Sequence, residues 1–275
     1  MNAITYNIPA RLFESYRGRK VILRSNSPSE LVSCLPPVNQ KDVQYAQLTS
    51  LNVDLEPLVS WAGAVPIDVL VQNPAVEYAS LYNFSKLLDK HPLRASISVK
   101  TAFVKAVRLA LALNFSVKLE VGQPDPKLIE EMGEVLDLYL HRSAVSQPVE
   151  YFHSTILSFF NKETPTNLWQ IQEEDPEQFR FITDEGAETA SARFGKTASR
   201  DLENIFAGRS RSTSGATTEC DTCEFLTQCG GYFKWPTPEF DCAGVKTLFS
   251  RLNSAALELR NDLASFQELQ QGQPA

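Results

Sequence analysis

Four of the chain's five cysteines gather near the C-terminus, at Cys220, Cys223, Cys229 and Cys242, with the spacing C-x2-C-x5-C-x12-C. Two cysteines separated by two residues can hold a metal centre from one tight turn, and two further thiolates complete a set of four ligands. Thiolates suit zinc and a [4Fe–4S] cluster, so the spacing leaves both open. We predict a metal centre with a structural role, because the tail is too poor in apolar residues to fold alone.

Three aromatic residues, Tyr232, Phe233 and Trp235, lie between the third and fourth of these cysteines, with Phe240 close behind. Large aromatic side chains concentrated in so short a stretch either cover the metal or form an interface. We favour the first role and retain Tyr232, Phe233 and Trp235 as candidates for contact with a peptide or a partner protein.

The remaining cysteine, Cys34, stands alone and is interpreted as a small buried apolar residue. The N-terminus lacks a basic region followed by an apolar one, and no apolar run is long enough to span a membrane. These features predict a protein of the reducing cytoplasm, where clustered cysteines are metal ligands more often than disulfides. The net charge of -7 and the isoelectric point near 5.1 argue against a general nucleic-acid binder.

The first half of the 275-residue chain alternates between expected strands and helices. A strand followed repeatedly by a helix requires parallel strands joined by right-handed crossovers, as in a partial barrel, a closed barrel or an open doubly wound sheet. The third strand is mostly apolar, which is typical of a strand covered on both faces. Neither a dinucleotide-binding nor a P-loop glycine motif is present. The five expected strands are residues 20–24, 43–49, 67–72, 94–99 and 117–121.

The pattern changes after residue 145, so we predict three parts: a partial β/α barrel over 1–145, a mainly helical extension over 146–206, and the cysteine tail with a long helix over 207–275. A further strand is possible at 179–183, and 186–206 has a helical pattern. The apolar stripe of the last helix runs through Val245, Leu248, Phe249, Leu252, Leu259, Leu263 and Phe266.

Other titratable residues suggest no catalytic group. His91, His141 and His153 have no metal-binding spacing and are interpreted as core or capping residues. The acidic run that includes Glu173 and Glu174 is interpreted as a solvated turn rather than an acid–base pair.

The cysteine stretch resembles the SPASM tail of radical SAM peptide maturases. In that family C-x2-C-x5-C, followed here by Gly230 and Gly231, combines with a distant final cysteine to ligate one auxiliary [4Fe–4S] cluster. The resemblance assigns these ligand positions to Cys220, Cys223, Cys229 and Cys242. It also implies a body of about six strand–helix units in a partial barrel, as the alternation predicts.

Two departures from the family pattern bear on function. Phe233 stands where the motif continues with another cysteine, so the resemblance leaves one auxiliary cluster of two. The family's catalytic C-x3-C-x2-C lies in the loop after the first strand, and the corresponding loop, residues 25–30, contains no cysteine. Without those thiolates no cluster can bind S-adenosylmethionine.

The resemblance therefore implies a degenerate member that kept the scaffold and lost the radical chemistry. We expect a non-catalytic accessory subunit in the biosynthesis of ribosomally made peptides. It would bind a precursor peptide, by strand addition to a barrel edge or to a strand-rich tail, and present it to a multinuclear iron oxidase or a radical enzyme in a hetero-oligomer. The alternative is a metalloenzyme that uses its single Fe–S cluster for peptide modification.

Overall fold

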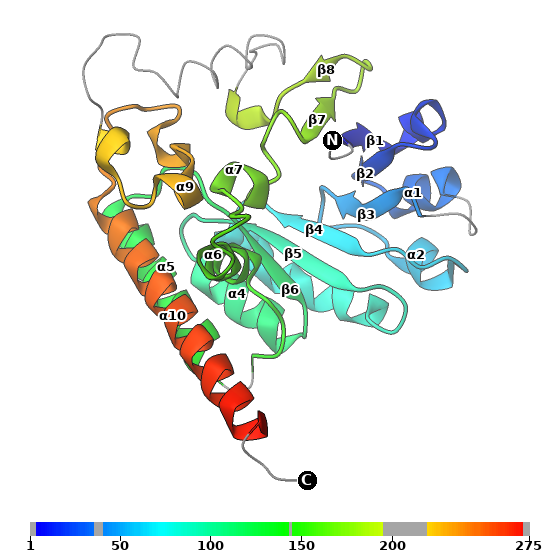
Figure 1. Ribbon diagram of the computed structural model, residues 1–275. Coiled ribbons are helices and arrows are strands. Elements are labelled where there is room, and N and C mark those ends of the chain that lie inside the picture. The colour runs from blue at the N-terminus through cyan, green and yellow to red at the C-terminus, as the bar shows by residue number, and fades with distance from the viewer. Residues whose placement is uncertain (1–3, 36–40, 143–144, 195–218, 272–275) are drawn as a thin grey trace.

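The computed structural model describes residues 4–35, 41–142, 145–194 and 219–271. Its centre is an eight-stranded, mostly parallel sheet with the strand order β6-β5-β4-β3-β2-β1-β7-β8 (Figure 1). Helices lie over both faces, which makes this a mixed α/β fold consistent with a partial β/α barrel. None of the helices in the described part is long and apolar enough to cross a membrane.

Six parallel strands follow one another from β1 to β6, and each pairs with the next. After β6 the chain crosses to the opposite edge, where β7 pairs in parallel with β1 and β8 returns antiparallel beside β7. The strands are β1 (Thr5–Pro9), β2 (Lys20–Ser25), β3 (Val43–Leu48), β4 (Ile67–Val71), β5 (Leu93–Ser98), β6 (Ser116–Glu120), β7 (Phe179–Ile182) and β8 (Glu188–Thr189).

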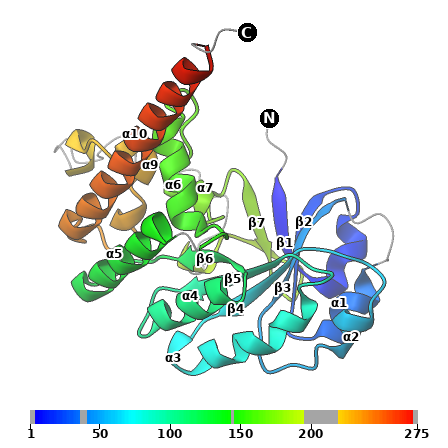
Figure 2. The same ribbon diagram turned by 90° about the horizontal axis from the view of Figure 1, so that it is seen from below.

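The crossovers between β1 and β6 are helices packed on one face of the sheet: η1 (Ala10–Tyr16), α1 (Pro28–Cys34), α2 (Glu56–Ser60), α3 (Pro74–Glu77), η2 (Tyr78–Leu87) and α4 (Phe103–Ala112). The later helices are α5 (Pro126–His141), α6 (Glu150–Phe160), α7 (Leu168–Ile171), η3 (Ala192–Phe194), η4 (Glu219–Thr222), α9 (Leu226–Cys229), η5 (Tyr232–Lys234) and α10 (Ala243–Gln271). The long α10 packs against α6 and α5 (Figure 2).

The five predicted strands are confirmed, but a strand that the sequence did not reveal precedes them. The predicted first strand is therefore β2, and β1 adds a sixth strand–helix unit before it. Helix α1 begins as expected, with the Ser27 side chain accepting a hydrogen bond from the Glu30 backbone amide and Pro28 in the first turn.

The two faces of the sheet differ in chemistry. Side chains toward the crossover helices are apolar and fully buried, as Val69 and Ala95 are. The alternate residues include apolar ones such as Leu70 but also the buried polar side chains of Gln47, Asp68 and Ser96. The third predicted strand is covered on both faces, as expected, since all of β4 is buried, and Asp68 is the polar residue on its inner face.

The segment predicted as a mainly helical extension supplies α6 and α7 and also strands β7 and β8, so the sheet extends across residue 145. The helix predicted over 186–206 is wrong for 186–194, which form β8 and the short η3, and its remainder lies outside the described residues. Residues 219–271 contain helices and turns and no assigned strand, so the expected strand-rich tail is also wrong in that part. The long final helix is confirmed as α10.

Candidate functional site

The four tail cysteines line one cavity between the turns of the tail and the start of α10. Cys220 and Cys223 come from η4 and the residue after it, Cys229 ends α9, and Cys242 directly precedes α10. All four are free thiols. The cavity's apolar walls are Phe225, Leu226, Phe233, Val245 and Phe249. The sequence-predicted ligand set is thus brought together around one space.

Three charged residues stand at the rim of this cavity. The Glu219 carboxylate accepts a hydrogen bond from Lys234 Nζ at 2.6 Å and another from Lys246 Nζ at 2.5 Å. Lys246 belongs to α10, while Lys234 follows the glycine turn. The ion pairs therefore tie the segment that carries Cys220 to the two other segments that frame the cavity.

Burial raises the pKa of the Cys229 thiol to about 11, and it also raises the pKa values of Cys220 and Cys242. Neighbouring thiolates would add mutual repulsion, since Cys242 and Cys220 both act on Cys229 in the same direction. Thiols in such a place ionise readily only when a cation compensates their charge, which is the condition that a metal ligand set creates.

The cavity does not decide between the two metal centres that the sequence leaves open. A zinc ion places four sulfurs about 2.3 Å from one point, whereas an iron–sulfur cluster holds its cysteines around a larger core. Within the described ranges, no group of three or more His, Cys, Asp or Glu side chains is arranged to hold a metal ion. The four cysteines share one cavity, and that they hold zinc or a cluster stays a prediction.

The three aromatic candidates face inward. Tyr232 and Phe233 are 1% exposed, and Trp235 is half-buried. Phe233 lines the cysteine cavity and stacks on Phe240, with ring centroids 5.9 Å apart. Of the three, Phe233 covers the cavity, whereas Tyr232 packs on Trp169 and Trp235 on Phe194. That any of them contacts a peptide stays a prediction.

Arg193 fastens the tail to the rest of the chain. Its guanidinium lies 3.9 Å from the centroid of the Tyr232 ring and donates hydrogen bonds to the carbonyls of Tyr232 and Trp235 at 2.9 and 2.6 Å. The Tyr232 hydroxyl in turn donates to the Val121 carbonyl at 2.7 Å, just beyond β6. Cation–π contact and charge-assisted hydrogen bonds together hold the cysteine segment against the sheet.

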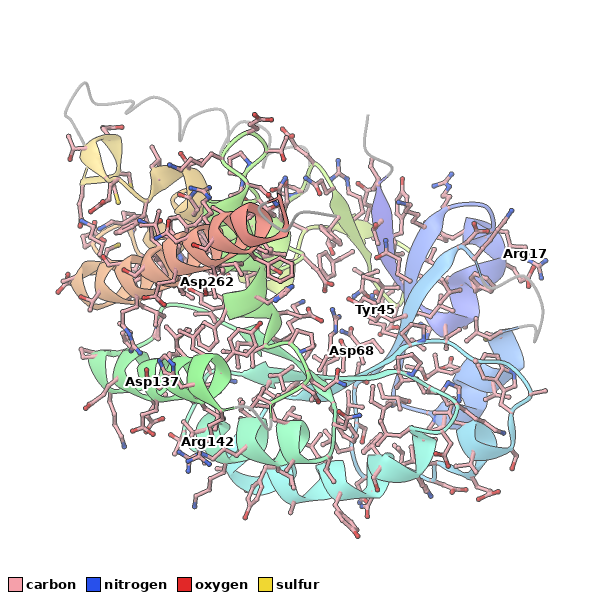
Figure 3. All side chains as sticks on the ribbon, turned by 60° about the horizontal axis from the view of Figure 1, so that its bottom comes forward. Arg17, Tyr45, Asp68, Asp137, Arg142 and Asp262 are labelled. Atoms are coloured by element: carbon pink, nitrogen blue, oxygen red, sulfur yellow. The ribbon has the colours of Figure 1, made fainter. Side chains whose placement is uncertain are left out.

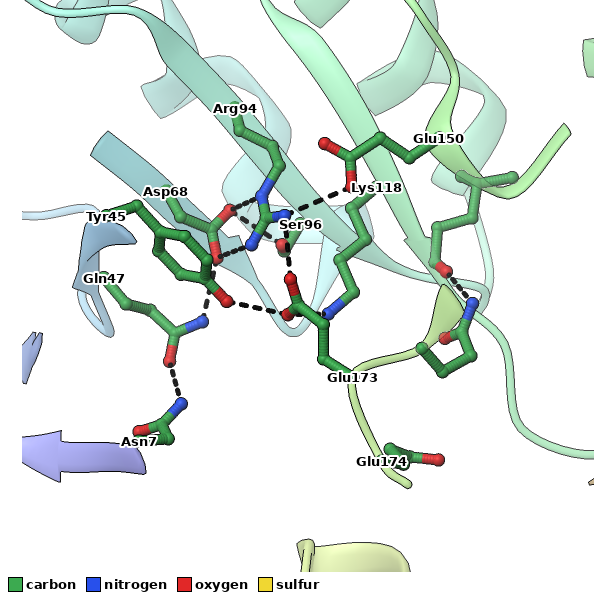
Figure 4. Close-up of polar contacts among 12 residues, drawn as sticks. Asn7, Tyr45, Gln47, Asp68, Arg94, Ser96, Lys118, Glu150, Glu173 and Glu174 are labelled. Carbon is green, nitrogen blue, oxygen red and sulfur yellow. Dashed lines mark hydrogen bonds and ion pairs between the residues drawn. The ribbon is translucent and has the colours of Figure 1, made fainter. Parts of the chain in front are cut away.

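A second cluster of polar side chains fills the inner face of the sheet (Figure 4). The Arg94 guanidinium on β5 pairs with the carboxylate of Asp68 on β4, through contacts of 3.1 and 3.2 Å. Asp68 also accepts hydrogen bonds from Ser96 Oγ at 2.7 Å and from Gln47 Nε2 at 2.8 Å. Tyr45 and Asp68 both lie on this side of the sheet in Figure 3. We call the set Asn7, Tyr45, Gln47, Asp68, Arg94, Ser96, Lys118, Glu150 and Glu173 the inner-face network.

Glu173 enters this network from the loop after α7. Its carboxylate accepts hydrogen bonds from Lys118 Nζ at 2.6 Å, Tyr45 Oη at 2.7 Å and Arg94 Nη1 at 3.1 Å. Its φ of 59° is in the left-handed region, which is uncommon for a residue other than glycine. The sequence interpretation of this acidic run as a solvated turn is therefore wrong for Glu173. It is also wrong for Glu174, which accepts a hydrogen bond from the Tyr232 hydroxyl at 2.9 Å.

Charges in the inner-face network act strongly on each other. Burial alone would raise the pKa of Glu173, but Lys118 and Arg94 hold it well below its ordinary value. Burial raises the pKa of Glu150, and Arg94 offsets only part of that effect. The sequence gives one hint of this cluster, which is the recurrence of single polar residues at alternate positions of apolar strands.

The loops at the carboxyl ends of the first two strands contain no thiol. After β2, Ser25 Oγ accepts a hydrogen bond from the Ser27 amide at 2.9 Å and donates one to the Glu30 carboxylate. After β1, residues 10–19 also lack cysteine. Neither loop therefore offers a thiolate ligand.

His91 has the core role expected of it, whereas His153 is exposed within α6 and is neither a core nor a capping residue. His91 is buried, lies 3.0 Å from the Val65 carbonyl through Nδ1, and stacks on Trp61. His153 Nδ1 lies 2.9 Å from the Tyr139 hydroxyl. His141 is the last residue of α5.

No family model matches the sequence, and no curated protein matches it. Among solved structures, the fold is similar to the crystal structure of SuiB from Streptococcus suis, with a TM-score of 0.48 and 13% sequence identity over 87% of this chain and 76% of that chain. At this level of similarity we draw no conclusion from SuiB about family or function.

Proposed function

We propose that the chain is a non-catalytic accessory subunit in the biosynthesis of ribosomally made peptides. It binds a precursor peptide and presents it to a partner enzyme, either a multinuclear iron oxidase or a radical enzyme. A cluster held by the four tail cysteines keeps the tail in shape. The inner-face network is the observation that carries the proposal, because it occupies the surface where a barrel enzyme would need room for a substrate.

The proposed centre is a [4Fe–4S] cluster, as the resemblance to SPASM tails implies, and zinc is the alternative. Cys220, Cys223, Cys229 and Cys242 would hold it, because all four line one cavity. When bound, a cluster with four protein ligands supplies a rigid core and has no open iron position for a substrate. Contacts within the chain then fix the tail. Lys234 and Lys246 form ion pairs with Glu219, and the Arg193 guanidinium packs on the Tyr232 ring.

The interior of the sheet supports presentation over catalysis. Glu173 is already held by two cations and a phenol, and Asp68 is held by Arg94, Ser96 and Gln47. Side chains paired with one another in this way form a buried ion-pair network, which supports a scaffold role. A peptide would instead add along the edge of the sheet at β8, which stands at one end of the strand order.

Metal analysis tests the cysteine site directly. We expect anaerobically purified protein to be brown and to contain about four iron atoms per chain, as one [4Fe–4S] cluster requires. Cys223→Ser should lose the iron and loosen the tail. Cys34→Ser is the matched control, since Cys34 lies on α1 outside the cavity. This variant should retain its iron and a tail as well ordered as in the wild-type protein. Colourless protein with one zinc ion, or full iron content in Cys223→Ser, would exclude the proposed cluster.

A binding assay tests the accessory role. The chain, a candidate precursor peptide and the candidate iron enzyme should form a stable ternary complex on size-exclusion chromatography. The isolated chain should leave the peptide's mass unchanged under reducing anaerobic conditions. Peptide modification by the isolated chain would instead support the alternative of a metalloenzyme with a single cluster.

A further inference from the structure

The apolar stripe of α10 continues beyond the part of the helix that the rest of the protein covers. Leu252 and Ala256 are buried, at 0% and 1% exposure. About one, two and three turns after Ala256 on the same side, Leu259, Leu263 and Phe266 are 39%, 45% and 58% exposed. The spacing from 252 to 259 to 266 and from 256 to 263 is seven residues, which is the repeat of a helix that packs lengthwise on another helix.

The covered part ends at Arg260. Its guanidinium donates hydrogen bonds to the Phe159 and Phe160 carbonyls at the C-terminal end of α6, at 2.8 Å for Phe159. Residues 261–266 are all exposed. In Figures 1 and 2 the red end of α10 extends past α6 into open space.

A helical end with no tertiary partner is marginally stable in water, and most helical stability in proteins comes from packing of an apolar face. The stripe on this end is therefore an apolar face without a partner inside the described chain. Contiguous exposed apolar side chains of this kind mark an interaction surface. Two turns of a seven-residue repeat fit the side of a second helix better than they fit a pocket.

The charges beside the stripe indicate which helix would fit. Glu258 and Asp262 follow Arg251 by seven and eleven residues, so they continue the side of α10 on which Arg251 pairs with Asp137 of α5. Figure 3 labels Asp262 on this part of the helix. Glu258 and Asp262 make no ion pair within the described residues, and Arg260 is occupied by α6. Backbone carbonyls leave the charge of Arg260 uncompensated, so Glu258, Arg260 and Asp262 together place a net negative charge beside the stripe.

We propose that the end of α10 is a docking face for a basic amphipathic helix of a second protein. That helix packs its apolar residues on Leu259, Leu263 and Phe266 and places Lys or Arg side chains beside Glu258 and Asp262. A second copy of this chain fits less well, because it would bring equal negative charge to the same contact and each copy carries a net charge of -7. The inference does not depend on the cysteine site or on peptide presentation.

Two synthetic helical peptides test this directly. Both carry leucine at the two apolar positions of each seven-residue repeat; one has lysine beside the stripe and the other has glutamate. In fluorescence anisotropy with the full-length protein at low salt, the lysine peptide should bind at least about tenfold more tightly than the glutamate peptide. Combining Glu258→Lys with Asp262→Lys should reverse this preference.

Substitutions within α10 supply the matched control. Combining Leu263→Glu with Phe266→Glu should weaken binding of the lysine peptide at least about tenfold, because charge replaces the apolar contact. Leu257→Glu should change binding by less than about twofold, since Leu257 is also exposed but lies off the stripe. Circular dichroism would verify that each variant stays folded.

Three results would overturn the proposal. The first is equal binding of both peptides, and the second is absence of saturation up to about 1 mM of the lysine peptide. The third is a dimer of this chain in light scattering that the paired Leu263 and Phe266 variant dissociates, because the face would then belong to a second copy.

Discussion

Lys118 on β6 donates a hydrogen bond of 2.6 Å to the carboxylate of Glu173, which lies 55 residues later in the loop after α7. This contact fastens the returning segment of the chain across the inner face of the sheet. It also brings together two residues that sequence patterns assign to unrelated roles, one inside a strand and the other in an acidic turn. The charge of each compensates the cost of burying the other.

Replacement of Glu173 with glutamine should destabilise the protein by about 3 kcal/mol, because it leaves the buried Lys118 without its carboxylate partner and removes one of the carboxylates paired with Arg94. Chemical denaturation at neutral pH would measure the change. Glu177→Gln is the control, since Glu177 is in the same acidic run but exposed, and it should change stability by less than about 0.5 kcal/mol. Equal effects of the two substitutions would contradict the role assigned to Glu173.

The stability contributed by Glu173 should also depend on pH. Because its pKa is lowered on folding, this contribution is complete above the unfolded value of about 4.3 and is lost as pH falls below it. The difference in unfolding free energy between the wild-type protein and Glu173→Gln should therefore narrow by about 1.4 kcal/mol per pH unit below about pH 4. A difference that stays constant or widens on acidification would show that Lys118 and Arg94 do not hold the carboxylate in its charged form.

The two glycines after Cys229 allow a paired comparison. Both have positive φ, 60° for Gly230 and 71° for Gly231, so alanine at either position should cost about 1 kcal/mol in backbone strain. A Cβ at Gly230 would also lie 3.0 Å from Trp169 Cδ1, whereas one at Gly231 would meet no atom within 4 Å. Gly230→Ala should therefore destabilise the protein more than Gly231→Ala, by a further amount of about 1 kcal/mol or more. Thermal unfolding of the two variants would measure the difference in stability. Equal stability would mean that the Trp169 side chain moves away from the added Cβ with no loss of stability.

Arg193→Lys should loosen the attachment of the tail. A lysine can replace one of the hydrogen bonds to the Tyr232 and Trp235 carbonyls but not the planar stacking on the Tyr232 ring. Hydrogen–deuterium exchange should accelerate in residues 219–242 and stay unchanged in β4 and β5. Arg17→Lys serves as the reference, because Arg17 is exposed and pairs only locally with Glu14. Unchanged exchange in the tail would show that Arg193 does not fasten it.

The local signals in the sequence were sufficient for most elements. Ser27 and Pro28 mark the start of α1, and Asp125 and Pro126 mark the start of α5, where the Asp125 side chain accepts a hydrogen bond from the Leu128 amide. The cysteine spacing correctly placed four thiols around one space. Each of these predictions depends on residues close together in the chain, whose geometry is set by backbone hydrogen bonding and turn chemistry.

The missing parts depend on contacts between distant residues. Strand β1 is a short stretch that becomes a strand because β2 and β7 flank it on both sides. Glu173 is surrounded by acidic neighbours in the sequence, and only the fold brings Lys118 and Arg94 to it. Asp68 and Arg94 each interrupt an apolar strand by one residue, and neither interruption reveals that the other lies beside it in the sheet.

The chemical difference between the two faces of the sheet also limits which alignments of the strands are possible. Asp68 lies opposite Arg94 in the β4–β5 pair, and Gln47 lies opposite Asp68 in the β3–β4 pair. A shift of β4 by one residue would turn Asp68 toward the apolar helices and would turn Val69 into the polar cluster. A misaligned sheet would bury an unpaired charge, so the network raises the free energy of shifted registers relative to the native one.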